Sequence, residues 1–154
     1  MTRKVLLDTN LLIAALDKSG TTSAEIKASA TKRLAELASE PDVALFITPL
    51  IRYEVLRGIN WLNEDDFHEM QAILNGFPEL EITRNISELS ANLYRYDSWQ
   101  VRQPGAVARN LEKRKFDVFH FCSAHCNGLE LCSLDTDIGR ITLLHRDFEA
   151  QMSH

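Results

Sequence analysis

The sequence has few cysteines and no long apolar stretch, and each shortage argues against a class of protein. The three cysteines are Cys122, Cys126 and Cys132; an odd number without a secretion signal predicts reduced thiols rather than a disulfide framework. No apolar run approaches the roughly 20 residues that a membrane span needs. Asp8 interrupts the first apolar run, which argues against a signal peptide. We therefore expect a cytoplasmic protein with no membrane partner.

An excess of positive charge is also missing. The chain has 17 lysines and arginines against 22 aspartates and glutamates, a net charge of −5, which argues against coating nucleic acid by bulk charge. Cleavage of nucleic acid stays open, because a site built of carboxylates itself lowers the net charge. Internal repeats, low-complexity tracts and a dividing linker are all absent, so residues 1–154 are expected to form a single domain.

The cysteines raise the question of a zinc site. Cys122 and Cys126 are one helical turn apart, with His120, His125 and Cys132 nearby. Their spacing matches none of the common zinc patterns, and small buried thiols are frequent in protein cores. The pattern therefore favours core cysteines over zinc ligands.

Short apolar blocks alternate with helical patterns along the chain. Residues 4–7, 43–47, 80–82 and 129–134 are interpreted as strands, residues 142–144 as a possible fifth strand, and the remainder as a frayed end. This alternation predicts an α/β fold of three layers, α/β/α, with a mostly parallel central sheet of four or five strands.

Helix boundaries are marked by capping signals. Capping boxes are predicted at residues 22–25 and 85–88, and Thr48 with Pro49 predicts a cap followed by proline in the first turn. Acids in residues 63–66 predict another helix start, and Asn127-Gly128 predicts a helix end. Thr9 or Asn10 is expected to cap the helix that follows the first strand.

Acidic residues occupy edge or unfavourable positions at four places. Asp8 follows the first strand, Glu54 lies inside a helix, Asp117 opens a nearly all-apolar helix, and Asp135 follows the last predicted strand, with Asp137 two residues on. Strand ends meet at one edge of a parallel sheet, so these side chains are expected to converge. Converging carboxylates repel one another, and Mg²⁺ or Mn²⁺ relieves that repulsion. Such an ion activates water for phosphodiester hydrolysis.

Each acid also has an ordinary structural explanation. Asp8 could cap a helix, Glu54 could pair with Arg57 three residues later, and Asp117 could favour a helix N-terminus electrostatically. Asp135 and Asp137 could be turn residues. The four acids are more informative together than singly, because their order along the chain is also the order of a known set of motifs.

The set consists of residues 7–10 (Leu-Asp-Thr-Asn), residues 53–58 (Tyr-Glu-Val-Leu-Arg-Gly), Phe116-Asp117 before an apolar helix, and residues 131–137 (Leu-Cys-Ser-Leu-Asp-Thr-Asp). In this order the motifs resemble the PIN domain family, especially its VapC-type toxin ribonucleases. The resemblance implies a PIN-like fold, with Asp8, Glu54, Asp117 and Asp135 as catalytic residues. It also implies that Asp8, Asp117, Asp135 and the less certain Asp137 bind Mg²⁺ or Mn²⁺.

The same resemblance implies a biological setting. It predicts a metal-dependent endoribonuclease, the toxin of a type II toxin–antitoxin pair, with a tRNA or rRNA substrate, a small antitoxin partner and a homodimeric state. Asn10 and Ser133 occupy the polar positions of the motifs and are assigned to substrate binding.

Several basic and aromatic residues could also contact a substrate. Arg109, Lys113, Arg114 and Lys115 precede Asp117 and could hold RNA phosphates, with Arg114 and Lys115 preferred; a solvated helix face is the alternative. Trp61 and Trp99 could stack a base or belong to the core or an interface. His120, one turn beyond Asp117, could approach the site, although core histidines are more common.

Two other function classes remain open. One is a PIN-like domain that binds RNA or protein without cleaving it, which the four acids argue against. The other is a phosphotransfer or phosphatase domain with an aspartyl nucleophile. Such enzymes commonly carry a second acid two residues after the first, and here that position is Asn10.

Overall fold

The computed structural model describes residues 2–18, 20–107, 109–134 and 138–153. Three strands and seven helices follow one another in these ranges: β1 (Arg3–Leu7), α1 (Thr9–Leu16), α2 (Ala24–Ser39), β2 (Val43–Phe46), α3 (Pro49–Arg57), α4 (Glu64–Leu74), α5 (Arg84–Val101), α6 (Arg114–Asn127), β3 (Glu130–Cys132) and α7 (Ile138–Met152). The alternation of strands and helices is the α/β pattern expected from the sequence.

The sheet is parallel and has the strand order β2-β1-β3. Val5 in the central strand is paired with Leu45 of β2 and Glu130 of β3. Val5, Leu6 and Leu7 are all buried, because helices cover both faces of the central strand. This is why β1 is a continuous apolar run rather than an alternating one.

The prediction of four or five strands is wrong for the described residues. Residues 80–82 form no strand, and the isolated parallel bridge in this region joins Ile47 to Glu79, the residue just before the segment. Residues 142–144 lie inside α7, and the supposed frayed end is helical as far as Met152. Ile141, Leu144 and His145 are buried in α7, which is the spacing of one helical face and not of a strand.

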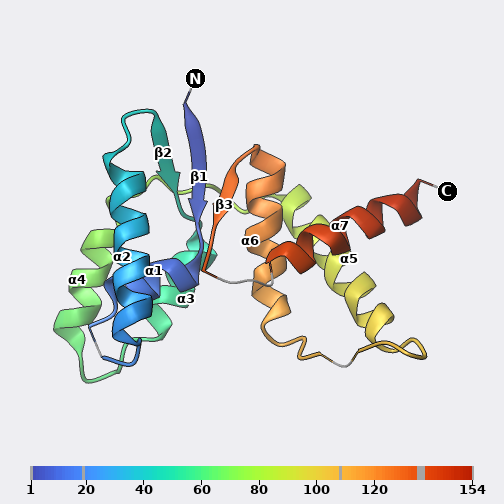
Figure 1. Cartoon of the computed structure of the whole chain (residues 1–154), viewed down its shortest axis with the longest axis horizontal. Helices are drawn as coiled ribbons and strands as arrows, with labels where there is room; N and C mark the ends of the chain where they lie inside the picture. Colours follow the sequence, from blue (N-terminus) through green and yellow to red (C-terminus); the bar gives the residue numbers. More distant parts are fainter. Residues whose placement is uncertain (1, 19, 108, 135–137, 154) are drawn as a thin grey trace.

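Helices on the two sides of the sheet complete the predicted three layers. Figure 1 shows α1 to α4 on one side of the strands and α5 to α7 on the other. The first group shares a core with β1, and the second has a smaller core of its own that includes Leu93 of α5, Val118 of α6 and Leu144 of α7. Helix α6 contacts β3 and thereby joins the second group to the sheet.

The capping signals are confirmed in part. Thr48 caps α3 by accepting a hydrogen bond from the Ile51 amide at 3.1 Å, with Pro49 next in the chain. Gly128 ends α6 in the left-handed conformation, at a φ of 68°, where glycine avoids the strain of a side chain. The other two caps are shifted: Ser23 caps α2, and Thr83 caps α5.

All three cysteines are free, and two of them are buried. Burial raises the pKa of the Cys122 thiol to about 11, so this side chain is a neutral core group at physiological pH. No helix within the described ranges is both long enough and apolar enough to cross a membrane.

Candidate active site

Asp8 stands where the central strand ends and α1 begins. Its amide donates to the Cys132 carbonyl at 3.0 Å, which continues the pairing of β1 with β3. Its carboxylate accepts from the Thr9 amide at 2.8 Å and caps α1. The expectation that Thr9 or Asn10 caps this helix is therefore wrong, because Asp8 does so itself. Only 5% of Asp8 is exposed, so its charge is held at the edge of the sheet with little contact to water.

Glu54 approaches the same place from α3. Its Oε1 accepts a hydrogen bond from the Thr9 hydroxyl at 3.1 Å and lies within hydrogen-bonding distance of His120 Nε2. The Arg57 guanidinium is 4.0 Å from Glu54 Oε2 and also lies over the Phe116 ring, 5.1 Å from its centroid. The expected ion pair with Arg57 is thus present only at the limit of contact, and the close partners of Glu54 are Thr9 and His120.

His120 of α6 is the centre of the cluster. It is 1% exposed, and its Nε2 is 3.9 Å from Asp8 Oδ1. Burial by itself lowers the pKa of this imidazole. The hydrogen bond with Glu54 and the charges of Asp8, Glu54 and Asp117 more than offset that effect and leave the pKa raised. His120 is therefore a buried residue that also contacts the acidic site, whereas the sequence presented these two placements as alternatives.

Asp117 belongs to the cluster through α6. It lies in the first turn of that helix, one turn before His120, and its charge acts on the imidazole. The helix N-terminus also favours an acid at this position. The structure therefore brings together Asp8, Glu54 and Asp117, from three separated segments, around one buried histidine. Asp135 and Asp137, the remaining predicted acids, lie outside the described residues.

Asn10 and Ser133 meet where the chain leaves β3. Asn10 Oδ1 accepts from the Ser133 hydroxyl at 3.0 Å and from the Leu134 amide at 3.1 Å. These bonds attach the segment after β3 to the first turn of α1, two residues from Asp8. Asn10 and Ser133, two of the four residues predicted to bind substrate, thus have a structural contact that holds Ser133 and Leu134 against the first turn of α1.

Comparison with known proteins identifies the family. A family model described as the PIN domain matches residues 5–143, nearly the whole chain. The chain belongs to the PIN domain family. No curated protein matches it.

Several solved structures share the fold of this PIN domain. VapBC2 from Rickettsia felis, bound to a DNA fragment from the promoter, is 16% identical with a TM-score of 0.60, covering 89% of this chain and 92% of the other. A toxin–antitoxin complex from Klebsiella pneumoniae is 20% identical with a TM-score of 0.56, and the match covers 86% of this chain and 87% of the other. Mycobacterium tuberculosis VapC20, described as a sarcin-ricin loop cleaving toxin, is 18% identical with a TM-score of 0.57, and the match covers 88% of this chain and 93% of the other.

The basic residues of this PIN domain are not equally available to a substrate. Arg114 is 7% exposed, and its Nε is 3.1 Å from Oδ2 of Asp97, a buried acid of α5 that Arg109 also pairs with. Lys115 is half exposed and pairs with Glu112 at 2.9 Å. The contacts of Arg114 join α6 to α5, so Lys115 is the more accessible of the two residues predicted to bind RNA.

Asp97 was missed in reading the sequence. Its signal is its position: it follows Leu93 by four residues in α5, and both are buried. An acid on the buried stripe of a helix requires a partner, and two arginines supply it here. Both predicted aromatic residues are exposed, Trp61 at 87% and Trp99 at 56%, and Trp99 stacks on Tyr96.

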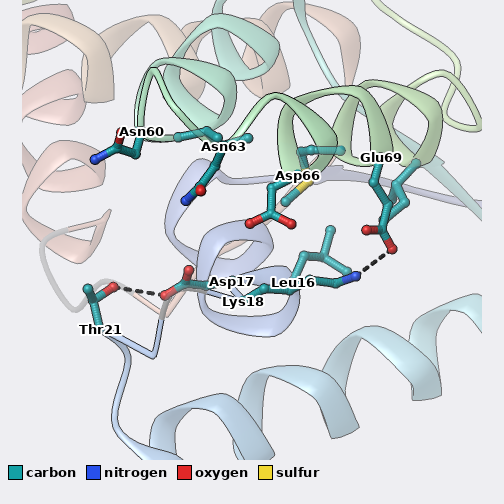
Figure 2. Close-up of a pocket in the computed structure, with 12 residues that line it drawn as sticks. Leu16, Asp17, Lys18, Thr21, Asn60, Asn63, Asp66 and Glu69 are labelled. Carbon is teal, nitrogen blue, oxygen red and sulfur yellow. Dashed lines mark hydrogen bonds and ion pairs between the residues drawn. The ribbon is translucent and has the colours of Figure 1, made fainter.

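A separate pocket of about 300 Å³ lies between the C-terminal end of α1, the α3–α4 connection and helix α4. Figure 2 shows Asp66 and Glu69 of α4 facing the chain after α1, where Lys18 pairs with Glu69 and Thr21 donates to Asp17 at 2.8 Å. None of the residues lining this pocket belongs to the Asp8–Glu54–Asp117 cluster. Two of its carboxylates, Asp17 and Glu69, have partners of their own in Thr21 and Lys18, so it is a weaker candidate for catalysis.

The acidic cluster fits a hard divalent cation. Asp8 is buried and Glu54 and Asp117 are partly buried, all three carboxylates act on His120, and oxygen donors of this kind are the ligands that Mg²⁺ and Mn²⁺ prefer. The negative charges of Asp8, Glu54 and Asp117 raise the pKa of His120. Glu54 is in close contact with this imidazole, and the Arg57 guanidinium is 4.0 Å from its Oε2.

Proposed function

We propose that this PIN domain is a divalent-metal-dependent endoribonuclease and the toxin of a type II toxin–antitoxin pair. The observation that carries the proposal is the convergence of Asp8, Glu54 and Asp117 on the buried His120. Mg²⁺ or Mn²⁺, when bound, supplies charge compensation and activation of water for attack on an RNA phosphodiester. The similarity to toxin–antitoxin complexes supports the biological setting.

Different residues of the chain have different tasks in this proposal. Asp8, Asp117 and Asp135 would hold the metal, with Asp137 as a further ligand. Glu54, whose carboxylate accepts from the Thr9 hydroxyl at 3.1 Å, would orient the reacting groups. The protonated His120 and a divalent ion would compensate the same negative charge.

Substrate binding is assigned to the residues around this cluster. Asn10 and Ser133 shape the segment after β3, through their hydrogen bond at 3.0 Å, and present polar groups beside the phosphate. Lys115 attracts the phosphates of the RNA backbone. Arg114 contributes less, because it is paired with Asp97. A tRNA or rRNA is the proposed substrate class. A small antitoxin and a second copy of this chain are the proposed protein partners, in the cytoplasm.

The decisive experiment measures cleavage of labelled RNA with Mg²⁺, with Mn²⁺ and with a chelator. We expect cleavage only with divalent metal, and loss of at least about a hundredfold in rate for Asp8→Asn and Asp117→Asn, since each removes a negative ligand. Asp65→Asn, an exposed acid of α4, is the matched control and should cleave as the wild type does. Circular dichroism and thermal unfolding verify that each variant is folded.

Two outcomes would contradict the proposal. Cleavage at the wild-type rate by Asp8→Asn would remove the acidic cluster from the reaction. Binding of RNA by the folded protein, with no divalent-dependent cleavage of tRNA or rRNA, would favour the non-cleaving alternative. The partner proposals are tested by co-expression with the product of the adjacent open reading frame and by measuring the mass of the free and bound protein in solution.

A further inference from the structure

A second cluster of metal-ligating side chains lies between α6 and α7, apart from the acidic site. It consists of His125 in the last turn of α6 and of His145 and Glu149, one turn apart on α7. One ligand atom from each residue lies within 4.8 Å of the other two. The two helices are in contact and lie side by side in Figure 1. We propose that these three residues form a binding site for a transition-metal ion such as Zn²⁺.

The geometry is close to what a tetrahedral ion requires. His145 Nε2 and Glu149 Oε1 are 2.9 Å apart, whereas two ligands with bonds of about 2.0–2.1 Å to one zinc ion are separated by roughly 3.4 Å. Glu149 is exposed, so its flexible side chain can rotate to bring the carboxylate to the distance that the ion requires. Three protein ligands leave the fourth position to a water molecule.

An aromatic ring holds the two histidines in place. Phe121, one turn before His125, stacks on that imidazole at 5.7 Å between ring centroids and contacts His145 at 5.3 Å. The centroids of His125 and His145 are 4.4 Å apart. The rings are therefore packed on one side by an apolar surface, which reduces the rotational freedom that metal binding would otherwise have to remove.

The donor set separates this site chemically from the acidic one. Two imidazole nitrogens and one carboxylate suit Zn²⁺, Co²⁺, Ni²⁺ or Cu²⁺, whereas Mg²⁺ prefers oxygen ligands alone. None of the three residues touches Asp8, Glu54 or Asp117 in the described contacts. An ion here would link α7 to the end of α6 and stabilise their packing, without taking part in the chemistry proposed for the other end of α6.

The test uses the full chain with any affinity tag removed, in an Asp8→Asn background that weakens binding at the acidic cluster. Co²⁺ is titrated and its visible absorption recorded, and Zn²⁺ affinity is then measured by competition. We expect one equivalent of Co²⁺ with the strong absorption of a four-coordinate site, and a rise in melting temperature on adding Zn²⁺. His125→Ala and Glu149→Gln, both at exposed positions, should each weaken binding by at least about tenfold.

His68→Ala is the matched control, since His68 is an exposed histidine of α4 whose contacts are with its own helix, at Gln71 and the Phe67 ring. It should bind Co²⁺ as the parent does. The proposal is overturned if the parent protein binds no Co²⁺ or Zn²⁺ at millimolar concentration. It is equally overturned if His125→Ala and Glu149→Gln, both verified as folded, bind with unchanged affinity. Because the readout is metal binding and not RNA cleavage, failure of the nuclease proposal leaves this test intact.

Discussion

His120 and Glu54 are hydrogen-bonded to each other at the end of the sheet, although 66 positions separate them in the sequence. This contact places a basic side chain where the carboxylates converge, and their negative charges raise its pKa. We expect the protonated imidazole to offset part of the charge that a divalent ion would compensate more fully, so that the acidic cluster can fold without metal. Four predictions test this arrangement and the contacts that support it.

Replacing His120 by alanine should destabilise the metal-free protein and make it more dependent on divalent ions. Breaking a buried charged pair costs about 3–5 kcal/mol, and since Glu54 is 11% exposed at its side chain, about 2–4 kcal/mol is expected. Mg²⁺ should then raise the melting temperature of the variant more than that of the wild type. Urea unfolding with chelator and with Mg²⁺ measures both effects.

The surface variant His68→Ala serves as the control for this experiment and should change the free energy of unfolding by less than about 0.5 kcal/mol. If His120→Ala unfolds in chelator at the same urea concentration as the wild type, the imidazole contributes nothing to holding the acids together.

The raised pKa of His120 predicts a particular dependence of stability on pH. Because its pKa is higher in the folded protein than in the unfolded chain, the folded state holds the proton more tightly. The stabilisation is fully present below the unfolded pKa of about 6.5 and is lost as pH rises through the folded value. In chelator, the difference in unfolding free energy between wild type and His120→Gln should therefore shrink with rising pH. A difference that grows above pH 6.5 would reverse the assigned sign.

The acids and the order of elements were predictable because each carries a local signal. An apolar block that ends in Asp8, and the nearly all-apolar helix that Asp117 opens, stand out without knowledge of tertiary contacts. The charge state of His120 depends on Glu54 and Asp8, which reach it only after folding, so no local pattern contains it. Asp8 is an intermediate case. The sequence predicted that it could cap a helix or belong to the acidic site, but these two roles were treated as competing explanations.

The two wrongly predicted strands are also explained by contacts that form only on folding. Residues 142–144 have β-branched and apolar character, yet Ile141, Leu144 and His145 are buried together because α7 packs on α5 and α6. Tertiary contact overrides local propensity there. Residues 80–82 reach the sheet only through Leu80, whose amide donates to the Ile47 carbonyl at 2.9 Å, too little to make a strand. The roles of Asp135 and Asp137 stay predictions.

Asn10 should contribute to stability independently of any RNA. Its side-chain oxygen accepts two hydrogen bonds, from the Ser133 hydroxyl and the Leu134 amide, and losing the acceptor removes both of these partly buried bonds. Asn10→Ala is expected to cost about 1–3 kcal/mol, whereas Ser133→Ala, which removes one of the two bonds, should cost about 1 kcal/mol. Urea unfolding without RNA gives both values. Equal stability of Asn10→Ala and wild type would mean that these bonds have no structural role.

Asp97 should be among the most sensitive acids of the chain, although it lies outside the acidic cluster. Its side chain is 1% exposed and is paired with Arg114, itself 7% exposed, and with Arg109. Asp97→Asn removes the negative charge that both guanidinium groups depend on, so a loss of about 3–5 kcal/mol in unfolding free energy is expected. Arg114→Met should cost less, because Arg109 still compensates Asp97.

A double-mutant cycle on Asp97 and Arg114 separates a structural from an RNA-binding role for the arginine. If the guanidinium mainly joins α6 to α5, the double variant Asp97→Asn/Arg114→Met is more stable than the sum of the single losses predicts, with a coupling of about 1–3 kcal/mol. RNA affinity of Arg114→Met, measured where the variant is fully folded, should then fall less than that of Lys115→Ala, whose side chain is half exposed. The opposite result would assign Arg114 to substrate binding: additive stability losses, together with a larger loss of RNA affinity for Arg114→Met than for Lys115→Ala. A buried ion pair that shows no coupling does not hold the two helices together.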